Sequence, residues 1–257
     1  MRQLIAPVVH HWRMAPGIHE LHLCAPEIAE TAQPGQFVHV RVSNSWDPLL
    51  RRPISLSRIG HRGGSLRPGE VGLLFEEVGR GTEAMARAEA GAGFDLLGPL
   101  GSGFSLRSTT RNALLVAGGL GIAPLIALAE LALSRDISVV LLAGASTAER
   151  LVPAGHLPAE IEYVVATDDG TAGHRGLVTD LVPEYLSWAD QLFSCGPMPM
   201  FSTLAGVLEG SSLPAQASVE NRMGCGLGAC LGCMIDTRKG RQRVCREGPV
   251  FDLRDLV

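Results

Sequence analysis

The sequence predicts a mixed fold class in three parts: an antiparallel β-barrel, a parallel-sheet α/β nucleotide-binding domain, and a small cysteine-rich domain. Three observations predict this order. Residues 1–107 contain short alternating strands and turn signals, residues 112–213 contain wholly apolar strands alternating with helices, and glycine and cysteine dominate residues 214–257. With 257 residues, 46% of them hydrophobic, the chain is long enough for more than one core.

In the first part, the strands show a period of two. Residues 37–42 place valines on one face and His39 and Arg41 on the other, and residues 71–75 repeat the alternation. Between these two strands, residues 61–70 are rich in glycine and arginine, which is typical of a surface hairpin connection. A small Greek-key barrel is the economical packing for such strands.

The second part predicts a parallel sheet that is buried on both faces. We expect strands at residues 113–117, 138–143, 162–166 and 191–194, and helices at residues 123–133 and 198–208. Residues 108–111 are the expected linker from the barrel, and we expect regular structure to stop after Pro214.

Charge and hydropathy exclude several partners. The net charge is −4, from 22 basic and 26 acidic residues with no long basic run, so we expect no nucleic-acid binding. Residues 113–133 have about the length of a membrane span, but three glycines and Pro124 interrupt them, and Glu130 would lie in lipid. We therefore expect no membrane insertion. The missing signal peptide and the clustered thiols predict a cytoplasmic location.

The cysteine pattern is the strongest chemical signal. Four of the six cysteines follow the spacing C-x4-C-x2-C and then a distant C: Cys225, Cys230, Cys233 and Cys245. This spacing matches the first three ligands of a plant-type [2Fe–2S] site, and the interleaved glycines at 224, 226, 228 and 232 allow positive φ and a tight wrap. Structural zinc and disulfides remain as alternatives, although zinc usually takes two tight pairs.

Two glycine turns follow apolar strands in the α/β part. The first, AGGLGIAP, contains Gly118, Gly119 and Gly121, and the second, SCGPMPM, contains Cys195, Gly196 and Pro197. Strand ends of this kind hold nucleotides in open α/β sheets. A glycine turn without a ligand is the alternative for the first, and a merely buried thiol the alternative for Cys195. In TDDGT, Asp168 and Asp169 indicate a turn first and ribose contacts second.

A second nucleotide site is indicated in the barrel. The segment RRPISLS at residues 51–57 and the turn GRGTEAM at residues 79–85 offer an arginine, a hydroxyl and a helix start. Arg51 and Arg52 could equally be solvated. No acid–base carboxylate pair or nucleophile elbow stands out, so we assign no catalytic residue and expect cofactors to carry the chemistry.

Taken in order, RRPIS, GRGT, GPLGSGF, GGLGIAPL, TDDGTAGHRGLVTDL, SCGPMPM and the cysteine cluster resemble the ferredoxin reductase superfamily. The resemblance is greatest to the electron-transfer subunits of bacterial dihydroorotate dehydrogenase B, and it covers essentially the whole chain. It implies an oxidoreductase component with an FAD-binding barrel at 1–107, an NAD-binding domain at 112–213 that takes NAD(H) as co-substrate, and a [2Fe–2S] domain at 214–257.

The resemblance also implies site residues. FAD would contact Arg52, Pro53, Ile54, Ser55, Leu74, Phe75, Glu76, Gly81 and Thr82, and the nicotinamide nucleotide would contact Gly118, Gly119, Gly121, Cys195, Gly196 and Pro197. The cluster ligands would be Cys225, Cys230, Cys233 and Cys245. In such subunits a tyrosine is expected where Phe75 stands and a basic residue at Glu76, which leaves mainly backbone contacts there.

The implied partner is an FMN-containing dihydroorotate dehydrogenase catalytic subunit, with two copies of each chain. Electrons would pass from dihydroorotate through the partner's FMN, the cluster and FAD to NAD+, in pyrimidine biosynthesis. Two other interpretations remain: a reductase subunit of another complex, such as a bifurcating transhydrogenase or an oxygenase, and a zinc-stabilised nucleotide-binding module. Arg150 is a candidate contact for the 2′-phosphate of NADP.

Overall fold

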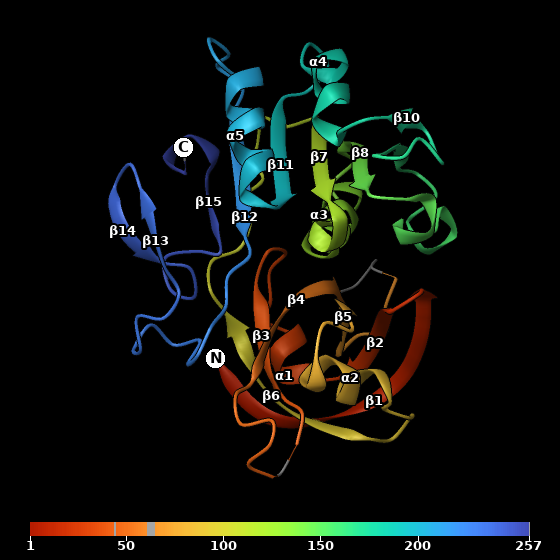
Figure 1. Cartoon of the computed structure of the whole chain (residues 1–257), viewed down its shortest axis with the longest axis vertical. Coiled ribbons are helices and arrows are strands. Elements are labelled where there is room, and N and C mark those ends of the chain that lie inside the picture. The colour runs from red at the N-terminus through yellow and green to blue at the C-terminus, as the bar shows by residue number, and fades with distance from the viewer. Residues whose placement is uncertain (44, 61–64, 257) are drawn as a thin grey trace.

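The computed structural model describes residues 1–43, 45–60 and 65–256. A barrel lies at one end of the molecule, an open sheet at the other, and a small C-terminal hairpin beside the sheet (Figure 1). Part of the expected 61–70 connection, residues 61–64, falls outside the described residues. No helix among the described residues is long and apolar enough to cross a membrane.

The barrel is closed and antiparallel, with the strand order β1-β2-β5-β4-β3-β6. Its elements are β1 (Arg2–Ala15), β2 (Ile18–Cys24), α1 (Pro26–Ala29), β3 (Phe37–Arg41), β4 (Arg52–Ile59), β5 (Glu70–Glu76), α2 (Arg80–Ala86) and β6 (Gly93–Leu100). Inward positions alternate with outward ones and form a single core inside the barrel, as the period of two predicts. The predicted Greek-key barrel is therefore confirmed.

One face of β3 differs from the expected pattern. The alternation predicts that His39 points to solvent, but its side chain is fully buried. The C-terminal cysteine segment covers this face of the barrel, because Gly226 packs directly on the His39 ring. The alternation of apolar and polar residues along one strand cannot reveal a contact with a segment so distant in the sequence.

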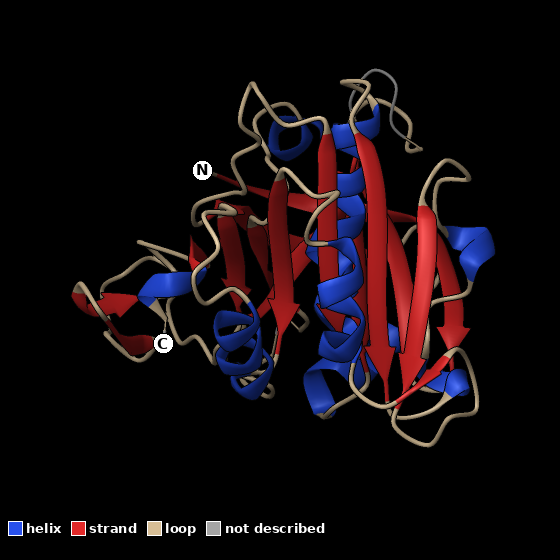
Figure 2. Cartoon of the chain, turned by 90° about the horizontal axis from the view of Figure 1, so that it is seen from above, coloured by secondary structure: helices blue, strands red, loops and turns tan. Residues whose placement is uncertain are grey.

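The second part is a seven-stranded sheet in the order β10-β9-β8-β7-β11-β12-β15. Its elements are β7 (Asn112–Gly118), η1 (Gly119–Gly121), α3 (Ile122–Leu133), β8 (Ser138–Ala145), η2 (Ala148–Arg150), η3 (Ala154–His156), β9 (Glu162–Thr167), β10 (His174–Arg175), η4 (Val178–Leu181), α4 (Val182–Tyr185), β11 (Gln191–Gly196) and α5 (Met198–Val207). The expected strands and helices are confirmed within a few residues, and Figure 2 shows the strands side by side.

Helices cover both faces of this sheet. The residues of α3 pack on one face, whereas α4 and α5 pack on the other. Helix α3 also faces the barrel, because Ala127 belongs to the barrel core (Figure 1). The apolar stretch 113–133 is thus a buried strand, a turn and a helix that lies between the two parts.

Regular structure does not stop after Pro214, so that expectation is wrong. Strand β12 (Ala215–Val219) pairs in parallel with β11, and β15 (Val250–Asp252) closes the sheet as an antiparallel edge. Between them lie the cysteine segment and a hairpin of β13 (Met234–Thr237) and β14 (Gly240–Arg243), and η5 (Leu253–Asp255) follows β15. The C-terminal segment is therefore anchored at both of its ends in the seven-stranded sheet. The expected domain limits remain predictions.

Candidate functional site

A pocket of about 460 Å³ lies between the barrel and the sheet, and we call it the central pocket. The predicted residues that line it come from β4, β5 and the turn before α2: Pro53, Ile54, Ser55, Leu74, Phe75, Glu76 and Thr82. Leu120 and Ala123 line it from the sheet side, and residues 218–223 from the C-terminal segment. The structure thus brings together at one pocket residues of the segments 51–57 and 79–85, which the sequence assigns to one nucleotide site.

Arg52 and Gly81 do not line the pocket themselves, but they join these two segments. A Cβ atom at position 81 would overlap the Arg52 guanidinium, so only glycine permits this approach. Arg52 also donates a hydrogen bond to the carbonyl of Leu50. Thr82 closes the turn itself, because its hydroxyl accepts hydrogen bonds from the N–H groups of Val78 and Gly79. Arg51 lies elsewhere and pairs with Asp95.

The Phe75 ring is buried and belongs to the barrel core, although the residue also lines the central pocket. A buried ring leaves mainly backbone contacts to a ligand there, as the phenylalanine in place of a tyrosine predicts. Glu76 pairs across the pocket edge with Arg150, which lies in the sheet part. Arg150 is therefore paired with a carboxylate here, and its contact with the 2′-phosphate of NADP stays a prediction.

Sequence reasoning missed Glu220, which lines the central pocket just after β12. Although the residue keeps some exposed surface, burial of its carboxyl raises the pKa above the usual value. The buried thiol of Cys195 lies close to it: burial, and then the charge of Glu220, raise the thiol's pKa. Cys195 therefore stays protonated at neutral pH. No local motif marks Glu220, since β12 was not expected.

A second pocket, of about 360 Å³, lies at the carboxyl ends of the parallel strands, and we call it the glycine-turn pocket. Gly118, Gly119 and Pro197 line it, together with Asp168 and Met200. Gly121, Cys195 and Gly196 are not among its lining residues. A Cβ atom at Gly121 would overlap the carbonyl of Cys195, so these residues bring the two turns into contact. Asp169 closes the adjacent turn through hydrogen bonds from Thr171.

Three of the four clustered thiols lie on residues 224–233, which we call the cysteine loop, and the fourth is Cys245. They form two pairs, Cys225 with Cys230 and Cys233 with Cys245. The Sγ atoms of Cys233 and Cys245 are 3.2 Å apart, and the N–H of Cys230 donates to the Sγ of Cys225 at 3.4 Å. All six cysteines are free thiols. Among the described residues, no three histidine, cysteine or acidic side chains gather at one metal-ion position. Two separate pairs fit a cluster with two irons, each held by two thiolates.

Backbone N–H groups point at the sulfur atoms. Leu227 donates to Cys225, Gly228 to Cys245, and Gly232 to Cys230, at 3.2–3.5 Å. Burial raises the pKa of Cys225, but the hydrogen bonds from Leu227 and Cys230 outweigh burial and lower that pKa to about 6. Such donors stabilise thiolates and sulfide, so the residues present fit the expected cluster.

Backbone conformation explains how the loop wraps. Gly226 and Gly228 have φ values of 70° and 80°, as the sequence predicts, but Gly224 and Gly232 do not lie in the left-handed region. Leu231 does, with φ of 58°, and its side chain is exposed. A leucine in this conformation carries a small strain that the sequence does not reveal.

His39 is a further residue that sequence reasoning missed. Both of its ring nitrogens lack a hydrogen-bond partner among the described residues. Burial, helped by the charge of Arg51, lowers the pKa of His39 to about 4, so the ring is neutral at pH 7. A Cβ atom at Gly226 would lie 2.8 Å from the ring, which places the imidazole directly beneath the cysteine loop.

Comparisons with known proteins agree with this geometry. A family model for the iron–sulfur cluster binding domain of dihydroorotate dehydrogenase B matches residues 220–257. An NADH-dependent reduced ferredoxin-NADP oxidoreductase has a similar fold, with a TM-score of 0.85 and 24% identity over 99% of this chain and 90% of that one. A ferredoxin NADP+ reductase from Neisseria gonorrhoeae with bound FAD and NADP has a TM-score of 0.66 and 16% identity, over 86% of this chain and 95% of that one.

The barrel and the open sheet give the chain a fold similar to that of ferredoxin reductases, and its C-terminal segment matches an iron–sulfur cluster binding domain. Two relatives, from Desulforamulus reducens and Geobacillus kaustophilus, are each named dihydroorotate dehydrogenase B (NAD(+)), electron transfer subunit. The first is 38% identical over 96% of this chain and 95% of its own, and the second 39% identical over 95% and 94%. The chain therefore belongs to the family of dihydroorotate dehydrogenase B electron transfer subunits.

Family membership makes the chain an electron-transferring component of an oxidoreductase, which implies a catalytic partner subunit. The expected fold class and family are confirmed. The family model supports the expected iron–sulfur cluster, FAD and NADP are bound in the Neisseria gonorrhoeae structure of similar fold, and the names of the relatives include NAD(+).

Proposed function

We propose that this chain passes electrons between NAD+ and an FMN-containing catalytic subunit that oxidises dihydroorotate, through FAD and a [2Fe–2S] cluster. Two observations carry the proposal: one C-terminal segment joins the central pocket to the cysteine loop, and the neighbouring residues Gly119 and Leu120 line the glycine-turn pocket and the central pocket, respectively. Residues 218–223 of this segment line the central pocket, and the cysteine loop follows directly. The names of the relatives supply the substrate and NAD+.

The cofactor assignments are residue by residue. The central pocket, with Ser55 and the Gly81–Thr82 turn, would hold FAD, and Arg52 would face its charged part. The glycine-turn pocket would hold NAD(H) at Gly118, Gly119 and Pro197. The cluster ligands would be Cys225, Cys230, Cys233 and Cys245. FAD supplies the exchange between a two-electron hydride and single electrons, which NAD(H) and a cluster cannot make directly.

The protein's own groups position these cofactors and control charge. Backbone N–H groups of the cysteine loop stabilise negative charge on sulfur, and His39 presents a neutral ring below the loop. Burial raises the pKa of both the Glu220 carboxyl and the Cys195 thiol, so two protonatable groups lie close together, with Glu220 at the lining of the central pocket. The Glu76–Arg150 ion pair connects the barrel to the nucleotide sheet at the pocket's edge.

Cytoplasmic location and an assembly with two copies of each chain are part of the same proposal. The test is to express the chain with the FMN-type catalytic subunit encoded in the same genome. The purified complex should reduce NAD+ with dihydroorotate, whereas the catalytic subunit alone should not. A mass of two copies of each chain is expected. If the chain forms no complex, or the complex forms but does not reduce NAD+ with dihydroorotate, this substrate assignment is wrong and another reductase complex becomes the better interpretation.

A further inference from the structure

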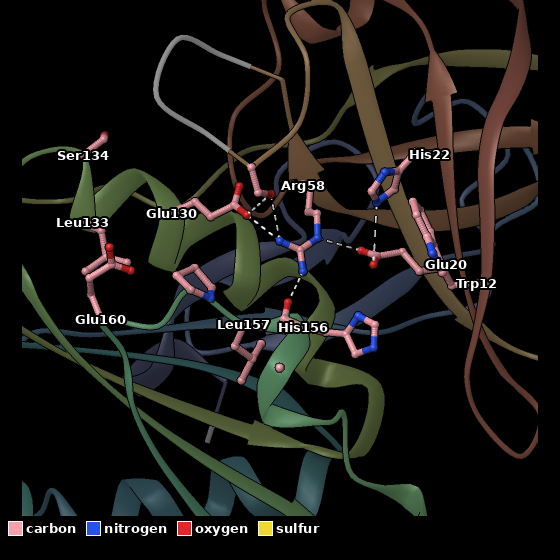
Figure 3. Close-up of a pocket in the computed structure, with 13 residues that line it drawn as sticks. Trp12, Glu20, His22, Arg58, Glu130, Leu133, Ser134, His156, Leu157 and Glu160 are labelled. Atoms are coloured by element: carbon pink, nitrogen blue, oxygen red, sulfur yellow. Dashed lines mark hydrogen bonds and ion pairs between the residues drawn. The ribbon is translucent and has the colours of Figure 1, made fainter.

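A cavity of about 590 Å³ opens on the side of the barrel where α3 and η3 pack against it, and we call it the lateral cavity. It shares no lining residue with the central pocket or the glycine-turn pocket. Its wall comes from β1, β2, β4, α3 and the residues around η3 (Figure 3). Its volume lies within the range of about 300–1,000 Å³ that small-molecule sites occupy.

One wall of the lateral cavity is a buried charge network. Arg58, only 6% exposed, donates from Nε to Glu20 Oε1 at 3.0 Å and from Nη1 to Glu130 Oε1 at 2.6 Å. Its Nη2 donates to the carbonyl of His156. Figure 3 shows the guanidinium between the two carboxylates. Arg58 therefore has partners on all sides, and it joins the barrel to the nucleotide sheet.

Among the residues that the structure describes, the lining of the lateral cavity carries more negative than positive charge. Glu20, Glu130 and Glu160 supply three carboxylates, and Arg58 supplies one guanidinium. Burial raises the pKa of Glu20, but the contacts with His22 and Arg58 outweigh it and hold this pKa below the usual value. Glu20 is therefore ionised at neutral pH. A cavity of this charge favours a cation over a neutral or anionic ligand.

Glu20 Oε2 and His22 Nε2 face each other on this wall without a direct hydrogen bond. Glu20 Oε1 accepts the hydrogen bonds from Ser57 and Arg58, whereas Glu20 Oε2 lies 3.7 Å from His22 Nε2. That separation is too long for a direct hydrogen bond. His22 is 9% exposed, and its Nε2 is buried without a hydrogen-bond partner among the described residues. An unpaired buried nitrogen destabilises the folded protein, and a hydrogen-bond partner in the cavity would remove that cost.

The aromatic ring of Trp12 completes the site. It lies at the lining of the cavity, with its centroid 4.5 Å from that of His22 in an edge-to-face arrangement. An ammonium group attracts aromatic faces and carries several N–H donors. It can thus donate to Glu20 Oε2 and, with the His22 proton on Nδ1, also to His22 Nε2, while its alkyl body contacts Leu133 and Leu157. A neutral hydroxyl at the same position would bind more weakly, because it makes no ion pair with the Glu20 carboxylate.

We propose that the lateral cavity is a binding site for a small primary alkyl amine, whose ammonium group is held by Glu20, His22 and Trp12. The proposal is independent of electron transfer, because none of these residues lines the other two pockets. Since Arg58 joins Glu20 to Glu130 on α3, an occupied site would also stiffen the contact between the barrel and the sheet.

The test is calorimetric titration of the purified full-length protein, with its cofactors, using 1,4-diaminobutane. Its neutral analogue 1,4-butanediol is the matched ligand control. We expect one saturable site for the diamine and binding of the diol at least about tenfold weaker, since a tenfold change corresponds to about 1.4 kcal/mol. The titrations contain a chelator, and zinc chloride is titrated separately without it.

Four variants separate recognition from folding. Trp12→Ala and His22→Leu should each weaken diamine binding about tenfold or more, whereas His22→Gln, which keeps a polar acceptor, should retain most of it. Trp46→Ala, at an exposed tryptophan outside the cavity, is the control and should bind as the unchanged protein does. Trp12 is 38% exposed, so its replacement tests the site even where His22→Leu does not fold.

Three results would overturn the proposal: no saturable diamine binding, equal binding of the diol, or unchanged affinity in both Trp12→Ala and His22→Leu. Binding of zinc alone, lost in His22→Leu while the diamine does not bind, would identify Glu20 and His22 as a metal site instead.

Discussion

The guanidinium of Arg52 lies against Gly81 so closely that the protein has no room for a Cβ atom between them. This contact holds the end of β4 against the turn that opens α2, and both border the central pocket. It explains why two segments thirty residues apart in the sequence act as one candidate FAD site.

Replacing Gly81 with alanine should therefore weaken flavin binding. Alanine favours the helix by about 0.5–1 kcal/mol, so the fold itself should not suffer, but the methyl group displaces Arg52. We expect the flavin dissociation constant to rise about tenfold or more, as loss of one charge-assisted hydrogen bond predicts. Gly79→Ala is the matched control, because a Cβ atom there meets no atom within 4 Å. Equal flavin retention in both variants would remove this contact from the site.

Cys230→Ser should abolish the cluster's absorption and transfer to the partner. NADH oxidation by artificial acceptors should persist, because the central and glycine-turn pockets contain none of the clustered cysteines. Iron analysis and the visible spectrum measure the first effect, and steady-state assays measure the second. Cys24→Ser, at an exposed cysteine of the barrel, should change neither. A cluster that survives in Cys230→Ser contradicts the ligand assignment.

His39 should make the protein sensitive to acid. Its pKa is about 4 in the folded state, against 6.5 for the free side chain, so protonation favours the unfolded chain. The stability is complete above pH 6.5 and falls as the pH drops toward 4, by about 3 kcal/mol at most, at about 1.4 kcal/mol per pKa unit.

Anaerobic melting curves between pH 7 and pH 5 measure this effect. The decrease in melting temperature should be smaller in His39→Gln than in the unchanged protein. The exposed His10 provides the control, and His10→Gln should keep the full decrease. Identical pH profiles for all three proteins would show that His39 does not titrate on unfolding.

Asp168 should select NADH over NADPH. Its side chain follows β9 and lines the glycine-turn pocket, where a carboxylate repels a 2′-phosphate. Asp168→Ala should raise the ratio of kcat/KM for NADPH to that for NADH by about tenfold, which corresponds to about 1.4 kcal/mol. Asp169→Ala is the neighbouring control, since Asp169 does not line the pocket and instead closes its own turn with Thr171. An unchanged ratio in Asp168→Ala places the determinant elsewhere.

Local patterns in the sequence were sufficient to predict the barrel and the alternating sheet, and they also supply the proposed cysteine ligand set. Period-two alternation, apolar strands and cysteine spacing are properties of neighbouring residues, so they are readable without a fold. Other features depend on contacts between distant segments. These are the packing of Gly226 on His39, the addition of β12 and β15 to the sheet, and the Glu76–Arg150 ion pair. Glu220 was missed for the same reason, because it becomes part of a pocket only once β12 joins the sheet.

The most direct test of the central claim is an anaerobic titration of the purified chain with NADH, followed by its absorption spectrum, together with iron, zinc and flavin analysis. The account predicts about one flavin and two irons per chain, with both the flavin and the cluster bands bleached by NADH. A colourless protein that contains zinc and no flavin would contradict it.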